Sequence, residues 1–231
     1  MKFGYFCNTT NWKHKPYETL LEETRQITNY CDENSWDSIW YTEHHFNHEG
    51  MEACTNPLMM GADAAARTKQ IRIGQACNVI TFHNPIRLAE DIALLDQLSN
   101  GRVEVGIGRG VYGREALNMN KEADLKDQSK NFRLFEETLT IMKKAWTEEF
   151  FSHEGEFYTY PAPNFVWLHD MSPPNKKFVD TETNEIKKLS VIPKPKQAPH
   201  PPIWQVVDGA RSIEWAARNG LNTIMWIPTV K

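Results

Sequence analysis

The sequence lacks the features that mark membrane-spanning, secreted or nucleic-acid-binding proteins. No stretch approaches the roughly 20 apolar residues that span a bilayer, and the amino-terminal segment has no long apolar signal core. Neither sign of charge dominates, because 26 Lys and Arg stand against 30 Asp and Glu, for a formal net charge of -4. This balance offers no field that would attract a phosphate polymer or an anionic bilayer. We therefore expect a cytoplasmic protein with neither nucleic acid nor a membrane as its partner.

Cysteine is scarce, and the cysteines lie far apart. The 231 residues contain four, Cys7, Cys31, Cys54 and Cys77, and no two of them form a C-x-x-C pair. This spacing argues against a zinc site or a disulfide framework. We expect four reduced thiols that pack as small apolar side chains.

The sequence does contain a regular alternation of strand-like and helix-like segments. The predicted strands cover residues 2–6, 38–42, 71–80, 102–107, 203–207 and 223–227, and the predicted helices cover 17–34, 57–67, 86–99, 132–146 and 212–219. Residues from about 148 to 202 break the pattern, since nine of the 13 prolines lie there. We interpret this part as an insertion or long loop within a single domain, 1–231. It could cover a site, bind a partner or act as a linker, and Phe165, Trp167 and Phe178 favour a cover.

Strands that alternate with helices indicate an α/β fold with a parallel sheet, and both a doubly wound sheet and a (β/α)8 TIM barrel fit this pattern. Two observations favour the barrel. Polar segments follow strand after strand, as they do where one face collects the functional loops, and no Gly-rich fingerprint follows the first strand. Only about six of the eight β/α units are present. The sequence therefore predicts an incomplete barrel that lacks its C-terminal part.

The segment after the second predicted strand carries Glu43, His44 and His45. Neighbouring side chains on a strand point to opposite faces, so we expect only one of the two histidines to face the barrel mouth. A neutral imidazole there can take or hold a proton near pH 7. A metal site would need further ligands such as Glu43, His48 or Glu49, but the spacing matches no strong metal signature. A structural pair of histidines is the remaining alternative.

Two further segments suggest an anion site on the same face. Gly106-Ile107-Gly108-Arg109-Gly110 ends the fourth predicted strand, where small residues allow close approach of a ligand and the planar Arg109 guanidinium suits a phosphate or carboxylate. Ser212 opens a helix, where its hydroxyl and the backbone N–H groups can bind an anion. A turn with a solvated arginine and a plain helix cap are the simpler interpretations. Together, Arg109 and Ser212 would form two halves of a phosphate site.

Four ordered motifs resemble those of the bacterial luciferase-like flavin-dependent monooxygenases. They are Tyr41-Thr42-Glu43-His44-His45-Phe46, Leu94-Leu95-Asp96-Gln97-Leu98-Ser99-Asn100-Gly101-Arg102, Gly106-Ile107-Gly108-Arg109-Gly110 and Ile213-Glu214-Trp215-Ala216-Ala217-Arg218-Asn219-Gly220. The order and approximate separations also match over nearly the whole chain apart from the insertion. The resemblance is specific to the family but not to one substrate.

The resemblance implies a TIM barrel that binds reduced FMN at the carboxyl ends of its strands and reacts it with O2. The C4a-hydroperoxide of the flavin would then oxygenate a small organic substrate, and a separate reductase would supply the reduced FMN. His44 matches the catalytic histidine beside the flavin. The cofactor-binding positions are Ala76 and Cys77, whose backbone would lie against the ring, often through a cis peptide, and Arg109, Gly110 and Ser212 at the phosphate.

The resemblance also leaves alternatives open. A dehydrogenase that uses the deazaflavin coenzyme F420 shares the barrel, and a relative that binds flavin without catalysis would keep the same cofactor site. Family members contribute a mobile lid and two more strands after the sixth strand, and these are absent here. Gly108 stands where the luciferase α-subunit has a cysteine, so light emission is not implied. Members of the family are commonly dimers, and the alanine-rich helix near residues 62–66 would permit a homodimer.

Overall fold

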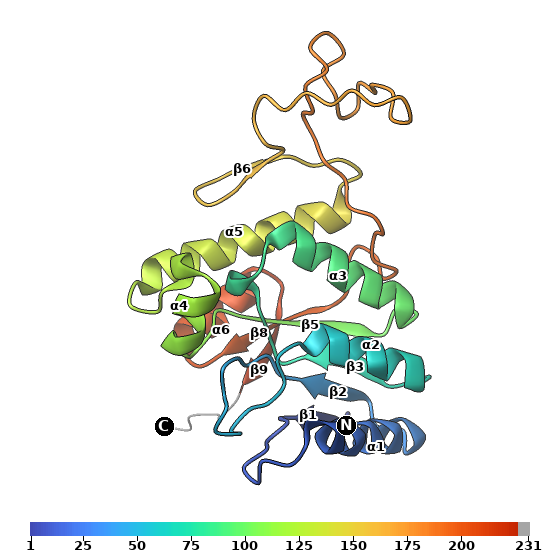
Figure 1. Ribbon diagram of the computed structural model, residues 1–231, viewed down its shortest axis with the longest axis vertical. Helices are drawn as coiled ribbons and strands as arrows, with labels where there is room; N and C mark the ends of the chain where they lie inside the picture. Colours follow the sequence, from blue (N-terminus) through green and yellow to red (C-terminus); the bar gives the residue numbers. More distant parts are fainter. Residues whose placement is uncertain (226–231) are drawn as a thin grey trace.

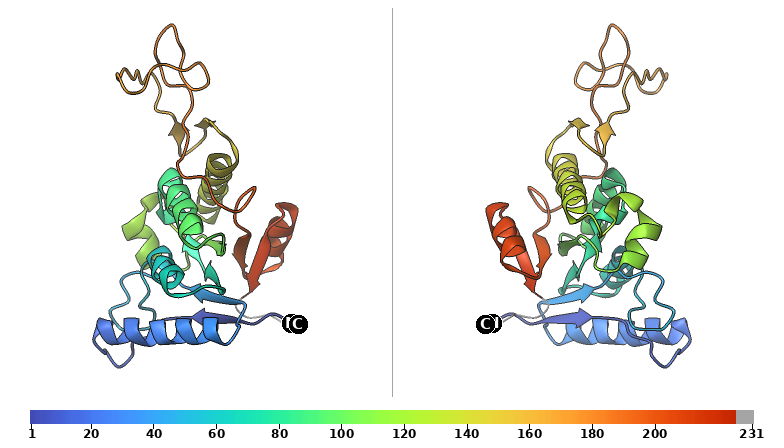
Figure 2. Two further views of the ribbon diagram at one scale, coloured as in Figure 1. Left: turned by 90° about the vertical axis from the view of Figure 1, so that its right-hand side faces the viewer. Right: turned by 90° about the vertical axis from the view of Figure 1, so that its left-hand side faces the viewer.

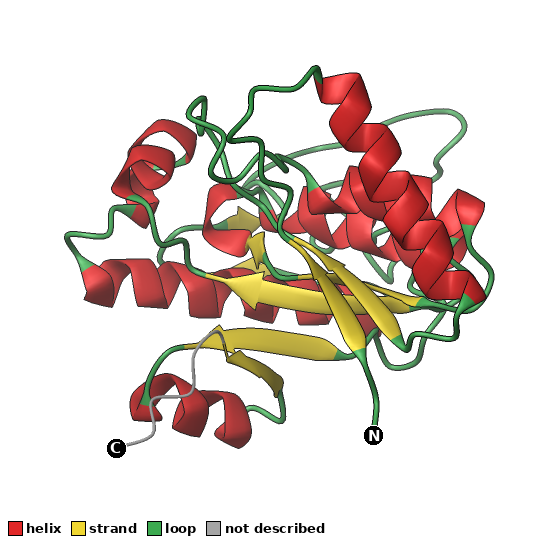
Figure 3. Ribbon diagram, turned by 90° about the horizontal axis from the view of Figure 1, so that it is seen from below, coloured by secondary structure: helices red, strands yellow, loops and turns green. Residues whose placement is uncertain are grey.

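The computed structural model describes residues 1–225 and shows a parallel sheet that curves into an open arc (Figures 1 and 3). The strands follow the order β1-β2-β3-β5-β8-β9, and β4 pairs with β5 beside β3. Among the described residues, β1 and β9 are not paired with each other, so the arc stays open. The strands are β1 (Gly4–Cys7), β2 (Ser38–Tyr41), β3 (Arg72–Gln75), β4 (Asn78–Val79), β5 (Val103–Gly108), β8 (Ile203–Val207) and β9 (Asn222–Met225).

The helices lie outside the arc, as the two side views show (Figure 2). They are α1 (Tyr17–Glu33), α2 (Pro57–Arg67), α3 (Pro85–Leu98), α4 (Gly113–Met119), α5 (Gln128–Thr147) and α6 (Ala210–Arg218), with 3-10 turns η1 (Ile80–Phe82) and η2 (Lys121–Ala123). In this part of the chain no helix has both the length and the apolar character that crossing a bilayer requires. The arrangement is part of a (β/α) barrel, in agreement with the predicted fold class.

Local sequence signals explain where two of the helices begin. The Asn56 side chain accepts a hydrogen bond of 2.9 Å from the Met59 N–H at the start of α2. Asn84 does the same for the first turn of α3, where its Oδ1 accepts from Ile86 N at 3.0 Å. In both helices a proline follows the capping asparagine, where its missing N–H removes no helical hydrogen bond.

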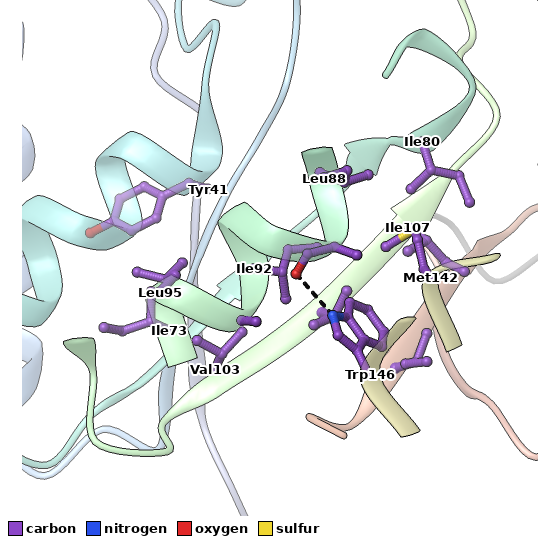
Figure 4. Packing of buried hydrophobic residues seen from close by; sticks show 14 of the residues in the cluster. Tyr41, Ile73, Ile80, Leu88, Ile92, Leu95, Val103, Ile107, Met142 and Trp146 are labelled. Carbon is purple, nitrogen blue, oxygen red and sulfur yellow. Dashed lines mark hydrogen bonds between the residues drawn. The ribbon is translucent and has the colours of Figure 1, made fainter. Parts of the chain in front are cut away.

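The main core lies between the sheet and helices α3 and α5 (Figure 4). Ile73 and Ile107 on the strands and Ile92 on α3 are fully buried in one cluster. The indole Nε1 of Trp146 on α5 donates to the Ala89 carbonyl of α3 at 2.9 Å, which satisfies a buried polar group. Full burial of one such aliphatic side chain contributes about 1.5–3 kcal/mol. This core holds the strands that carry the functional loops.

Large side chains fill the amino-terminal end of the barrel interior. The Trp40 and Trp204 rings meet edge to face with their centroids 5.4 Å apart. Trp204 Nε1 also donates to Glu104 Oε2 at 2.6 Å, and Glu104 forms an ion pair with Arg72. The Trp40 ring occupies the space above Gly74, where a Cβ atom would lie 2.2 Å from a ring carbon. The interior is therefore packed at this end.

The insertion forms a projecting arm, defined here as residues 148–202, which extends beyond α3 and α5 (Figures 1 and 2). Its regular structure is the antiparallel pair β6 (His153–Glu154) and β7 (Thr159–Tyr160). At its base, Phe151 and Leu189 pair through backbone hydrogen bonds of 2.9 and 2.8 Å. Residues 148–202 thus form a largely irregular segment that lies outside the arc of strands.

Several predicted boundaries differ from the structure. The predicted strand 71–80 is divided into β3, β4 and η1, and α4 was not predicted. Helix α5 begins at Gln128 rather than residue 132 because Asp127 caps it, accepting from Lys130 N at 2.9 Å. Of the last predicted strand, 223–227, residues 226 and 227 lie outside the described residues. All four cysteines are free, as predicted.

Candidate functional site

A cavity of about 410 Å³ lies at the carboxyl ends of β2, β3, β5 and β8. This volume falls within the roughly 300–1,000 Å³ typical of pockets for small molecules and cofactors. All the predicted site residues line it: His44, Ala76, Cys77, Arg109, Gly110 and Ser212. Among the described residues, none of the arm lines the cavity, which contradicts the expectation that the insertion covers the site.

Of the two histidines after β2, only His44 lines the cavity. Its Nε2 lies 3.1 Å from Glu52 Oε1, and its Nδ1 lies 3.4 Å from Glu115 Oε1. The Tyr112 ring packs against the imidazole at a centroid distance of 5.4 Å. His45 points elsewhere and contacts Glu43, as the alternation of side chains along an extended segment predicts. His44 is therefore held from several sides with its ring at the cavity wall.

Glu43 is a buried carboxylate at the cavity wall that connects three segments of the chain. Its oxygens accept hydrogen bonds from Val79 N at 2.7 Å and face His83 Nε2 at 2.8 Å and His45 Nε2 at 3.1 Å. Burial alone would raise the pKa of Glu43, but these hydrogen bonds outweigh it and lower the pKa. Burial likewise opposes the charged form of His83, yet the contact with Glu43 leaves the pKa of His83 raised. The sequence named Glu43 only as one of several residues that a metal site would need, in a spacing that matches no strong metal signature. In the structure Glu43 joins the segments around the cavity.

The Glu43–His83 pair predicts how the stability of the fold depends on pH. The pKa of Glu43 is lowered from its ordinary 4.5, so its contribution is present above 4.5 and is lost as the pH falls through the folded pKa. The pKa of His83 is raised from 6.5, so its contribution is complete below 6.5 and is lost as the pH rises through the folded pKa. In urea unfolding, we expect His83→Gln to cost more free energy at about pH 5.5 than at about pH 8.5. A cost that grows with pH would contradict this expectation.

The connection from β3 to β4 brings backbone to the cavity wall. The Ala76–Cys77 peptide is cis, as the family resemblance implied. A Cβ atom on Gly106 would lie 1.6 Å from the Gln75 carbonyl oxygen, and one on Gly108 would lie 2.3 Å from Cys77 Sγ. The glycines of β5 therefore admit the neighbouring strand and its thiol, whereas the sequence suggested that they admit a ligand. Burial raises the pKa of the Cys77 thiol, which favours its protonated form.

Arg109 follows directly after β5 and lies against α5. Its Nη1 donates to Gln128 Oε1 at 3.2 Å and to Asn131 Oδ1 at 3.4 Å, and its guanidinium lies 5.5 Å from the Phe132 ring centroid. Burial lowers the pKa of Arg109, and nearby Arg211 lowers it further against the opposing effect of Asp208. Neutral groups thus orient the Arg109 side chain, and its guanidinium can still donate N–H hydrogen bonds to an anion.

The start of α6 differs from the prediction. The capping residue is Gly209, and Ser212 is the third helical residue, with its hydroxyl donating to the Gly209 carbonyl at 2.9 Å. The Ser212 hydroxyl therefore has partners within its own helical turn, although the residue lines the cavity. Arg211, which the sequence did not single out, places its guanidinium 5.8 Å from the same Phe132 ring that Arg109 contacts.

Glu52, Tyr112 and Glu115 also line the cavity and were missed by the sequence analysis. Glu115 lies on α4, a short helix without a clear periodic pattern, and Glu52 lies in the irregular segment between β2 and α2. Their positions depend on loop paths that no local pattern encodes. The resemblance quoted the segment that contains His44 but gave no signal for the carboxylates around it.

The family model described as luciferase-like monooxygenase matches residues 1–230. The chain belongs to the luciferase-like monooxygenase family. This membership was predicted from the four motifs, and three of them contribute residues to the cavity wall or to the helix beside it.

Among curated members of the family, the chain is 30% identical over 223 residues to the oxygenase component of flavin-dependent trigonelline monooxygenase from Acinetobacter baylyi. That alignment covers 96% of this chain and 53% of the relative. The chain thus spans about half the length of the curated relatives it matches.

Solved structures support the fold assignment. The monooxygenase RslO1 from Streptomyces bottropensis has a TM-score of 0.79 at 26% identity, covering 100% of this chain and 61% of that one. The oxygenating constituent of 3,6-diketocamphane monooxygenase from Pseudomonas putida, in complex with FMN, has a TM-score of 0.78 at 22% identity, covering 97% of this chain and 57% of that one. The second likeness shows the fold alone. The open arc is therefore part of a luciferase-like barrel.

Proposed function

We propose that the chain binds reduced FMN and supports the O2-dependent monooxygenation of a small organic substrate. The observation that carries the proposal is that His44 and Arg109, from different strands, line one cavity. The trigonelline monooxygenase relative is named as flavin-dependent and as an oxygenase component. A separate flavin reductase would accordingly supply the reduced FMN.

The residues present fit FMN. The cavity has a volume suited to a cofactor, and Ala76 and Cys77 line it, so that their backbone would lie against the ring. Arg109 would donate to the phosphate, and Gly110, with a φ of 84°, lets the chain turn there without a side chain. Bound reduced flavin supplies the electrons that activate O2. His44 would hold or donate a proton at its Nε2 or Nδ1, and Tyr112 would shield that imidazole from water.

A stopped-flow measurement of reduced FMN oxidation by O2 tests the proposal. We expect hydrogen peroxide to be released more slowly with the wild-type chain than from free reduced FMN. In His44→Ala the rate of release should be about tenfold higher than in the wild type, since a positioned acid or base contributes at least this much. His48→Ala is the matched control, because the His48 side chain is 92% exposed and pairs with Glu49, outside the cavity. Equal peroxide release by the His44→Ala variant and the wild-type chain would refute the role of His44.

A homodimer remains part of the proposal. The alanines at 64 and 65 belong to the core of the chain itself, so α2 would meet a partner through exposed side chains such as Met59. A sedimentation measurement that gives one protomer at micromolar concentration would contradict the dimer.

A further inference from the structure

Hydrogen-bond acceptors gather at the part of the cavity next to His44. Glu52 and Glu115 each direct Oε1 toward the imidazole, at 3.1 and 3.4 Å. The second oxygen, Oε2, of each carboxylate is buried and has no partner among the described residues. Both residues line the cavity. Each carboxylate thus lies beside His44 with Oε1, and in Glu115 this oxygen also accepts a hydrogen bond from His45 N at 2.7 Å. The Oε2 atoms of both carboxylates are left without a partner.

The negative charge of these carboxylates is not balanced by the cations nearby. The Glu115 side chain is fully buried and that of Glu52 is 14% exposed. Arg114 is already engaged, with Nη2 at 2.8 Å from Glu49 Oε1 and 2.7 Å from Asn47 Oδ1. Even a protonated His44 would neutralise only one of the two charges. Burying an uncompensated charge is costly, so a positively charged ligand would stabilise this arrangement.

Two neutral side chains point to the same kind of ligand independently. Thr42 is 1% exposed and Gln205 is 3% exposed, and both line the cavity. Thr42 Oγ1 and Gln205 Oε1 have no hydrogen-bond partner among residues 1–225. Buried polar atoms in native proteins are nearly always paired, and an amide oxygen can only accept, so Gln205 Oε1 indicates a group that donates hydrogen bonds. The Thr42 hydroxyl can accept from the same group.

We propose that the organic substrate carries an ammonium or related cationic N–H group, which Glu52 and Glu115 recognise beside His44. The inference rests on the proposed function, in which the flavin phosphate occupies the Arg109 end of the cavity. The same cavity then offers the Arg109 guanidinium to an anion and the Glu52 and Glu115 carboxylates to a cation. In this proposal Glu52 and Glu115 determine which substrate binds, and the His44 imidazole beside them takes part in the reaction.

The test compares two probes of nearly equal shape, benzylamine, an ammonium at neutral pH, and benzyl alcohol, which is neutral. Both are titrated by calorimetry into the full chain loaded with oxidised FMN. We expect the wild-type chain to bind benzylamine about tenfold more tightly than benzyl alcohol, because one hydrogen bond to a charged group changes affinity by at least about this factor. Glu52→Gln should remove most of that preference. The affinity of Glu52→Gln for benzyl alcohol should differ from that of the wild type by less than about twofold.

Control variants separate this effect from others. Glu49→Gln removes a carboxylate three positions away that pairs with Arg114 outside the cavity, so it should leave the preference intact. Glu115→Gln should also reduce the preference for benzylamine, provided that its melting temperature stays close to that of the wild type. If Glu115→Gln is destabilised, the result for Glu52→Gln alone tests the inference. If the wild-type chain binds FMN but shows no preference for benzylamine over benzyl alcohol, this inference is refuted while the proposed function stands. A chain that fails to bind FMN refutes the proposed function.

Discussion

Replacing Arg109 with alanine is expected to weaken FMN binding by about 100-fold, which corresponds to roughly 3 kcal/mol. The guanidinium lies at the cavity wall with its ring contact and side-chain partners already formed, so it pays little ordering entropy when an anion arrives. Charge-assisted hydrogen bonds to a phosphate are about twice as strong as neutral ones. Fluorescence titration of oxidised FMN gives the affinity.

Riboflavin, which lacks the phosphate, is the matched ligand for this experiment. Arg109→Ala should leave riboflavin affinity nearly unchanged, because the cavity wall beside the ring is intact. Arg133→Ala is the matched protein control, since Arg133 lies on α5 and pairs with Glu156 on the exposed surface. If the Arg109 variant binds FMN as tightly as wild type, the phosphate site lies elsewhere.

Substitution of Gly106 by alanine is expected to destabilise the fold by about 3 kcal/mol or to prevent folding. The added Cβ would lie 1.6 Å from the carbonyl oxygen of Gln75, which belongs to the backbone of β3. A clash with backbone cannot be relieved by rotating a side chain, so β3 and β5 would have to separate. Urea unfolding followed by circular dichroism measures the change in unfolding free energy.

Gly113 provides the internal comparison, because a Cβ there meets nothing within 4 Å. It is the first residue of α4, so Gly113→Ala should be neutral or stabilise by up to about 1 kcal/mol, since glycine costs conformational entropy in a helix. Equal stability of the Gly106 and Gly113 variants would show that β3 and β5 tolerate separation.

The sequence predicted the repeated β/α pattern because the periodic placement of apolar residues encodes it directly. Helices α2 and α3 carry capping asparagines followed by prolines, so their starts could also be anticipated. The division of the strand at 71–80 could not be predicted from periodicity. It depends on the close approach of Gly106 to Gln75, a contact between residues 31 positions apart.

The predicted site residues meet in one cavity because each lies just after a strand, and parallel strands place their carboxyl ends on one face. Their partners were less accessible to prediction. Glu52 and Glu115 reach His44 from an irregular segment and from a short helix, and the distances to its ring depend on three-dimensional loop paths. The resemblance identified His44, whereas the carboxylates around it required the structure.

The base of the arm has a consequence for how such barrels diversify. Phe151 and Leu189 are hydrogen-bonded across the base, and β5 pairs directly with β8, so the chain leaves and re-enters the barrel at nearly the same point. A lineage can therefore lengthen, shorten or exchange the segment between these two residues without altering strand register or the residues that line the cavity. The arm can therefore change its surface during evolution while the residues of the cavity stay the same.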